Sequence, residues 1–266
     1  MLKEKSFKVT LVTGEPFRIG AKQHPLSGAD NPVTKLGGKL VIPGSTIKGA
    51  LRSEVERLLI DTYYENDRWK QGFEAFKPCI PGAELSKDEE KLVDSGKYRD
   101  KIGACHYPCN PKKCGNTNHS ICPACYLFGS MGLTGFVKVP FLYAEVSPTD
   151  ITGTRIDRAR NTVFEKRGRG ALYTYEVVPD GVTFSGMLRV LLEDTVLDWN
   201  LGEPRDLGEE RTLGDLWLKD NKGKMDDKAQ EEFIKTYITE RLKRINVLGG
   251  YKSKGFGNVE ISVEPL

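Results

Sequence analysis

The sequence predicts an α+β fold in which the elements follow the order β-α-β-β-α-β. Two kinds of apolar pattern lead to this prediction. Residues 7–12 and 258–263 alternate apolar and polar side chains, as half-buried strands do. Residues 45–64 and 227–246 instead repeat apolar side chains at helical spacing. With the segments between them set aside as insertions, this order is the ferredoxin-like plan, which RNA-recognition modules share.

The first part of the chain supplies one strand and one helix. The strand places Phe7, Val9 and Leu11 on one face. A short apolar run at 39–42 then ends in a Pro-Gly turn, and Ser45 is predicted to cap the helix that follows. The apolar face of that helix consists of Ile47, Leu51, Val55, Leu58 and Leu59.

The second part supplies further strands and the second helix. Strands are predicted at 137–146, near 173–178, at 182–192 and at 258–263. The pair Gly249-Gly250 is predicted to stop the helix that precedes the last strand. The inward face of this helix consists of Phe233, Tyr237, Ile238, Leu242 and Ile245.

The length of 266 residues suits one elaborated domain, so we expect a single modified RRM-like domain over residues 1–266. Three segments interrupt its pattern: a cysteine-rich insertion at 66–136, a basic hairpin at 150–175 and an acidic loop insertion at 193–225. No apolar run has the length of a membrane span, and the N-terminus lacks the apolar core of a signal peptide. We therefore expect a cytoplasmic protein without a membrane partner.

The cysteine-rich insertion predicts a structural zinc site. Five of the six cysteines and two of the three histidines lie between Cys105 and Cys125. Cytoplasmic cysteines seldom form structural disulfides, so metal binding is the favoured explanation. Cys122 and Cys125 form a metal knuckle, and Cys109 with Cys114 supplies the predicted second pair. Four protein ligands would close the site and leave no position for chemistry.

Other interpretations of this segment stay open. The cysteines can be free thiols, although their spacing argues against it. Cys79, which lies apart from the cluster, is predicted to pack as a small apolar residue or to support the edge of the cluster. The alternative zinc ligands are Cys79, Cys105, His106 and His119.

The net charge of +3 is unevenly distributed. Residues 16–52 carry six Lys or Arg against one acid, and residues 152–170 carry six against two. Residues 246–257 carry two lysines and no acid. All three segments are rich in glycine, which lets a backbone approach phosphates closely. This pattern favours a polyanion partner over the alternative of three solvated loops.

Three motifs lie within these basic segments. In the first, Lys48 and Arg52 lie near the N-terminus of the first helix, a position that favours anions. The alternative is an ordinary amphipathic helix in which Arg52 pairs with Glu56. The second, 152–177, predicts a β-hairpin with a basic tip for nucleic acid, or else a mobile solvated loop; its arginines are Arg155, Arg158 and Arg160. The third, 248–261, alternates glycines with cations and aromatics, as suits an RNA backbone with stacked bases. Its candidate RNA-binding residues are Gly249, Gly250, Lys252, Lys254, Gly255 and Gly257.

Asp30 is the sole acid of the first basic segment, within GADNPVTK at 28–35. A carboxylate there can coordinate Mg²⁺ or orient an attacking 2′-hydroxyl. The alternative is an Asx-turn residue that pairs locally.

Together these motifs resemble the RAMP superfamily of CRISPR systems, and within it the repeated backbone subunit of type III effector complexes. The stretches that carry the resemblance are GADNPV, PGSTIKGALR, CPACYLFGS, TRIDRARNT and LGGYKSKGFGNV. The third of these resembles a zinc-binding insertion found in a subset of such subunits.

The resemblance implies a role for each motif. Asp30 would promote cleavage of target RNA with a divalent cation, Mg²⁺ or another, through the 2′-hydroxyl. Lys48, Arg52 and the glycine-rich loop would hold the phosphates of the crRNA. The arm near 152–172 would wedge into the guide–target duplex. Copies of the chain would stack into a filament along the crRNA, together with other subunits of a type III complex.

Three other functions remain as alternatives. The chain can be a non-catalytic crRNA scaffold of the same complex. It can be a crRNA-processing endoribonuclease that uses His24 as a general base. It can also be a zinc-stapled RNA-binding module unrelated to CRISPR. For the acidic insertion, 193–225, we expect contact with a neighbouring subunit.

Overall fold

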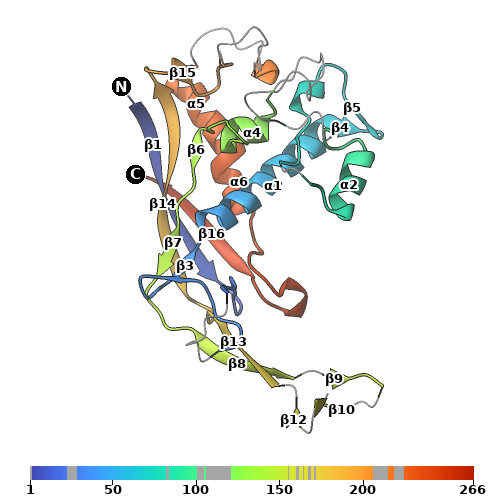
Figure 1. Ribbon diagram of the computed structural model, residues 1–266. Helices are drawn as coiled ribbons and strands as arrows, with labels where there is room; N and C mark the ends of the chain where they lie inside the picture. Colours follow the sequence, from blue (N-terminus) through green and yellow to red (C-terminus); the bar gives the residue numbers. More distant parts are fainter. Residues whose placement is uncertain are drawn as a thin grey trace.

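The computed structural model consists of a twisted sheet with helices on one face and a hairpin that projects from one end (Figure 1). No helix in the described part of the chain is long and apolar enough to cross a bilayer. The structure describes the chain apart from residues 1, 23–28, 82–83, 101–104, 106–120, 155, 160–161, 164, 167–168, 171, 206–214 and 219–224.

The main sheet is antiparallel and has the strand order β16-β1-β14-β7-β3-β2. The four strands of the predicted plan are β1, β7, β14 and β16 in chain order. In the sheet, β16 lies beside β1, and β14 lies between β1 and β7. This order confirms the ferredoxin-like prediction. Two short strands, β6 and β15, also pair with β14. The strands are β1 (Leu2–Thr13), β2 (Lys35–Leu36), β3 (Lys39–Ile42), β6 (Val137–Lys138), β7 (Leu142–Ala144), β14 (Thr183–Asp194), β15 (Trp199–Asn200) and β16 (Val259–Pro265).

The core lies between this sheet and the helices that cover one of its faces (Figure 1). Alternate residues of the two central strands point inward, among them Leu11 and Leu188, which are fully buried. Leu51 and Leu242 meet them from the helices and are also fully buried. The helices are α1 (Gly44–Tyr63), α5 (Asp227–Ile234), a π-helical turn (Lys235–Thr239) and α6 (Glu240–Lys243).

The two helix boundaries differ from the predictions. Pro43 rather than Ser45 occupies the N-cap of α1, and no side chain caps it. The helix begins at Gly44. The backbone oxygens of Val139 and Pro140 crowd this position, and a Cβ there would lie 2.6 Å from the first of them, so glycine fits where a larger residue would not. The second helix ends at Lys243, ahead of the glycine pair.

The basic segment forms the predicted hairpin. Its arms are β8 (Thr149–Thr154) and β13 (Leu172–Val177), which pair with each other and not with the main sheet. The strand predicted near 173–178 therefore belongs to the hairpin. The tip holds two short pairs, β9 (Ile156–Asp157) with β10 (Thr162–Val163), and β11 (Glu165–Lys166) with β12 (Arg169–Gly170).

The cysteine-rich insertion contains short elements that pack beside α1 (Figure 1). Among them is α4, whose six residues are all buried. These elements are β4 (Tyr64–Glu65), β5 (Arg68–Trp69), a 3-10 turn (Glu74–Phe76), α2 (Lys87–Asp94) and α4 (Pro123–Phe128).

Part of the acidic insertion, including Leu201, Trp217 and Leu218, belongs to the core of this same chain, whereas Val196 and Leu197 are exposed. Arg205 and Asp215 form an ion pair in which both side chains are 0% exposed. The 3-10 turn Leu216–Leu218 brings Trp217 against Tyr126 of α4, with the ring centroids 5.3 Å apart. Deleting 203–224 to test a subunit contact would therefore also remove core side chains.

Candidate metal centre and nucleic-acid interface

Four cysteine sulfurs come together beside α1. The Sγ atoms of Cys79, Cys105, Cys122 and Cys125 all lie within 4.8 Å of one another. Cys122 occupies the N-cap of α4, and its sulfur accepts a hydrogen bond from the Cys125 backbone N–H. The Cys122 N–H donates to the sulfur of Cys105 at 3.2 Å, and the Cys105 N–H donates to that of Cys79 at 3.4 Å. Local backbone donors thus hold three of the four sulfurs.

The cluster contains the predicted knuckle of Cys122 and Cys125, but its other two members are Cys79 and Cys105. The sequence signal for Cys79 was weak, because it lies 26 residues before Cys105. It is a member of the cluster rather than only a small apolar residue at its edge. The other ligand candidates, Cys109, Cys114, His106 and His119, lie outside the described residues.

Arg52 faces this cluster and not the surface. Its guanidinium donates to Glu56 Oε1 at 2.7 Å, to the Cys79 carbonyl at 3.0 Å and to the Cys125 sulfur at 3.3 Å. The residue is 9% exposed. Burial alone would lower the pKa of Arg52, but the nearby thiols and Glu56 outweigh burial and raise it. This placement confirms the pairing of Arg52 with Glu56, whereas the assignment of Arg52 to crRNA phosphates stays a prediction.

The charges around the cluster suit bound thiolates. Burial raises the pKa of Glu56 to about 7, against the opposing effect of Arg52. A second cation, Arg99, donates to the Cys105 sulfur at 3.7 Å. Because four thiolates around a divalent ion leave a net negative charge, two arginine contacts offset part of it.

The spacing also fits a tetrahedral zinc ion. Zn–S bonds of about 2.3 Å at tetrahedral angles separate the sulfurs by about 3.8 Å. The sulfurs of Cys79 and Cys125 are 3.4 Å apart, and those of Cys79 and Cys122 are 3.8 Å apart. The buried cluster could therefore bind zinc, and four thiols would complete the coordination of the ion.

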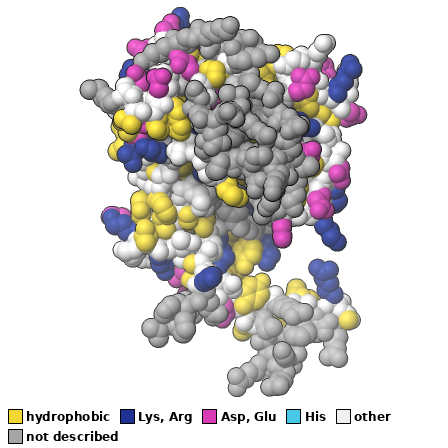
Figure 2. Space-filling view, turned by 45° about the horizontal axis from the view of Figure 1, so that its top comes forward, with side chains coloured by type: hydrophobic (Ala, Val, Ile, Leu, Met, Phe, Trp, Pro, Cys, Tyr) yellow, Lys and Arg dark blue, Asp and Glu magenta, His cyan; other side chains and the backbone are white. Residues whose placement is uncertain are grey.

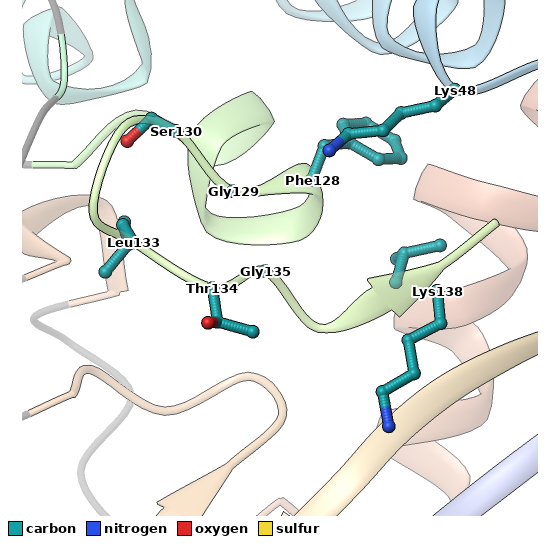
Figure 3. A pocket seen from close by; sticks show the side chains of 9 residues that line it. Lys48, Phe128, Gly129, Ser130, Leu133, Thr134, Gly135 and Lys138 are labelled. Atoms are coloured by element: carbon teal, nitrogen blue, oxygen red, sulfur yellow. The ribbon is translucent and has the colours of Figure 1, made fainter. Parts of the chain in front are cut away.

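Lys48 lines a pocket of about 320 Å³ (Figure 3). The far side of the pocket is a glycine-containing loop, 129–135, that follows α4, and Lys138 stands at its edge. Within the described part of the chain, no hydrogen bond or ion pair holds the Lys48 ammonium, whereas Lys138 pairs with Glu4. The Ser130 hydroxyl, which also lines the pocket, is buried and has no hydrogen-bond partner among the described residues. An unpaired cation beside an open pocket is suited to an anion.

Asp30 lies at the base of the hairpin and is exposed. Its Oδ2 accepts a hydrogen bond from the backbone N–H of Thr174 on β13, at 2.8 Å. This bond joins residues 144 apart in sequence, so the pairing is not that of a local Asx turn. No hydrogen bond to Oδ1 exists among the residues that are described.

The C-terminal glycine-rich loop lies beside the same hairpin base. The ring of Tyr251 is 5.7 Å from that of Tyr175 on β13, and Phe256 is 6.2 Å from Tyr175. Gly249 has φ 88°, and a Cβ there would lie 2.5 Å from the Arg18 carbonyl. The other candidate residues belong to the same loop. They are the exposed lysines Lys252 and Lys254, which lie in a 3-10 turn, and the glycines Gly250, Gly255 and Gly257.

The remaining predicted residues lie on the hairpin or outside the described chain. Arg158 is exposed at the turn between β9 and β10. Arg155, Arg160 and His24 lie outside the described residues. Among the described residues on the face shown in Figure 2, basic side chains are dispersed and do not form one continuous patch.

A family model and solved structures match this chain. No curated protein matches the sequence. Among solved structures, a chain of a "Type IV-B CRISPR Complex" is similar, with a TM-score of 0.46 and 13% identity over 97% of this chain and 90% of that one. A chain of "Cryo-EM structure of the Type III-B Cmr-beta bound to cognate target RNA" has a TM-score of 0.47 and 15% identity over 99% of this chain and 61% of that one. The model of the RAMP superfamily matches residues 10–260. The chain therefore belongs to the RAMP superfamily.

Proposed function

We propose that this chain is a crRNA-binding backbone subunit of a type III CRISPR effector complex and that it cleaves target RNA through Asp30. One observation carries the proposal: three motifs that are far apart in sequence meet at one place. Asp30 bonds to β13, and the glycine-rich loop packs its aromatic residues against the same strand. An exposed acid thus lies beside a cationic, aromatic loop at the base of a projecting arm.

The proposed RNA contacts would suit any guide sequence. Lys48 at its pocket and the exposed Lys252 and Lys254 offer unspecific phosphate contacts. Tyr251, under the Lys254 ammonium at 4.6 Å, adds an aromatic surface on which bases can stack. A subunit that leaves sequence recognition to base pairing needs contacts of this kind. Copies of the chain would stand side by side along the crRNA, in the cytoplasm, with other subunits of the complex.

The proposed reaction uses the target's own 2′-hydroxyl. Asp30 would orient this hydroxyl and take its proton as the 2′ oxygen bonds to phosphorus. The bond from phosphorus to the 5′ oxygen would break, and the 5′ oxygen would leave as a hydroxyl with a proton from water, so that a cyclic phosphate remains. A divalent cation, Mg²⁺ or another, would neutralise charge on the phosphate. A single exposed carboxylate cannot build a two-metal site, so such an ion would rest on Asp30 and RNA oxygens.

Asp30→Ala tests the catalytic half of the proposal. In the assembled complex, target cleavage is expected to fall to background, while the dissociation constant for target RNA stays unchanged, because Asp30 makes no base contact in this scheme. The matched control is Asp180→Ala, because Asp180 is also an exposed aspartate near the base of the hairpin. The complex with this variant should cleave target RNA at the parent rate. If the Asp30→Ala complex cleaves target RNA at the parent rate, the catalytic assignment of Asp30 is wrong. A parent complex that binds target but never cuts favours the non-catalytic scaffold instead.

Lys48→Ala tests the guide contact. Loss of one phosphate contact should weaken guide binding at all sequences alike and reduce the slope of log K against log salt by about one. The control is Lys8→Ala, an exposed lysine on the uncovered face of the sheet. Filter binding over a salt series measures both effects. Equal slopes for the two variants would remove Lys48 from the interface.

The RNA that copurifies with the chain separates the remaining alternatives. Repeat-derived guides of defined length support a subunit of a CRISPR complex. Heterogeneous RNA supports an RNA-binding module unrelated to CRISPR. Precursor cleavage that is lost in His24→Ala would support the processing enzyme.

We also propose that the four-cysteine cluster binds a structural zinc ion. The ligands would be Cys79, Cys105, Cys122 and Cys125, in place of the predicted pair Cys109 and Cys114. The ion would tie the insertion to α1 and α4, where the chain has few regular elements of its own.

A further inference from the structure

A second carboxylate lies beside the Asp30 loop, but it faces the protein. The Glu176 side chain on β13 is 15% exposed. Its Oε2 accepts a hydrogen bond from the Val33 backbone N–H at 2.9 Å, and its Oε1 pairs with Lys35 Nζ at 2.8 Å. Burial opposes ionisation of Glu176, but the bonds from Lys35 and Val33 outweigh it and lower its pKa. Glu176 therefore fixes the C-terminal end of the loop that carries Asp30.

Arg18 holds the same loop at its centre. Its Nη2 donates to the Pro32 carbonyl at 3.1 Å, and its Nε donates to the Glu176 carbonyl at 3.2 Å. The residue is 7% exposed. Its own carbonyl accepts from the Gly250 N–H at 2.8 Å, and its guanidinium lies 5.2 Å from the ring of Tyr251. One buried side chain thus contacts the aspartate loop, the hairpin and the glycine-rich loop.

Backbone bonds complete the attachment. Asn31 donates to the Thr174 carbonyl at 3.2 Å and accepts from the Glu176 N–H at 3.0 Å, which places it against β13 as a short parallel bridge. Together with the Thr174 bond to Asp30, every residue from 30 to 33 is bonded to β13 or to Arg18. Asp30 therefore takes its position from the hairpin strand.

We propose that Glu176 and Arg18 are positioning residues that seat the Asp30 loop on the hairpin strand, so that the carboxylate meets the target strand where the hairpin enters it. This inference rests on the proposed cleavage by Asp30. Glu176 does not touch the RNA in this arrangement. Its effect reaches the reaction through the position of Asp30, and a displacement of about 1 Å in a catalytic group is enough to cost about a hundredfold in rate.

The experiment compares Glu176→Ala and Glu176→Gln in the assembled complex. Single-turnover cleavage of bound target should fall by roughly ten- to a hundredfold in Glu176→Ala, with the target dissociation constant unchanged. Glu176→Gln should recover most of the rate, because its amide oxygen still accepts from Val33. The control is Glu145→Ala, which breaks the exposed Lys39–Glu145 pair at the sheet edge and should leave the rate unchanged.

Amide exchange separates this inference from the proposed function. In Glu176→Ala the backbone amides of Asp30, Asn31 and Val33 should exchange faster than in the parent, and in Glu176→Gln they should exchange at nearly the parent rate. Unchanged exchange in Glu176→Ala overturns the seating role, whether or not the parent cuts RNA. Faster exchange with an undiminished cleavage rate overturns it as well, because the loop would then not need to be held. Equal loss of target binding and cleavage would point to a general structural defect and also count against it.

Discussion

Asp215→Ala is expected to lower the free energy of unfolding by about 3–5 kcal/mol, because it leaves a buried guanidinium without a counter-charge. The Asp215 carboxylate accepts hydrogen bonds from Arg205 Nε at 3.0 Å, from Nη2 at 3.2 Å and from the Arg205 backbone at 3.1 Å. Neither side chain of the pair is exposed. The guanidinium also lies 4.7 Å from the ring of Tyr126 and 5.1 Å from that of Trp199.

Urea denaturation of the purified chain measures this effect. The matched control is Asp88→Ala, which breaks the exposed Lys91–Asp88 pair on α2 and should leave the unfolding midpoint where it was. Replacing both buried partners together, as Arg205→Met with Asp215→Leu, should cost less than Asp215→Ala alone. If Asp215→Ala and Asp88→Ala had the same midpoint, the ion pair would have no structural role.

Cys125→Ser is expected to release the proposed zinc ion and to lower the melting temperature by on the order of 10 °C. The helix that carries Cys125, α4, has six residues and cannot persist without support. Its side chains Tyr126, Leu127 and Phe128 are buried in the core, so loosening of α4 exposes apolar surface. A strong chelator should have the same effect on the unmodified chain.

Zinc content per chain, measured by mass spectrometry, decides between the two ligand sets. Cys125→Ser and Cys79→Ser should contain no zinc, whereas Cys109→Ser and Cys114→Ser should each keep one ion and melt as the parent does. Loss of zinc from Cys109→Ser would restore the ligand pair predicted from spacing. A full complement of zinc in Cys79→Ser would remove that residue from the site.

Local pattern predicted the scaffold of this protein well. Alternation at Phe7, Val9 and Leu11 and helical spacing around Leu51 depend only on neighbouring residues, and the elements they predict are present. The knuckle of Cys122 and Cys125 was visible for the same reason, since both ligands lie within one helical turn. Fold class and part of the metal cluster were therefore accessible without a structure.

The placement of charged residues was less accessible. Helical spacing put Arg52 one turn from Lys48, and both were expected at an RNA surface. In the structure, α4 and the cysteine cluster pack over Arg52 and leave Lys48 at an open pocket. Which of the two neighbouring cations is covered depends on Cys79 and Cys125, which lie 27 and 73 residues from Arg52. No local pattern encodes such contacts.

Sequence alone was enough to establish the ferredoxin-like order, the hairpin, the cysteine-rich insertion and the candidate acid, because each depends on residues close together in the chain. Tertiary structure was needed to bring Cys79 to the cluster, to turn Arg52 inward and to seat Asp30 on β13 through Thr174, Glu176 and Arg18. These contacts join segments separated by 14 to 158 residues, and only the packed chain brings such segments within hydrogen-bond distance.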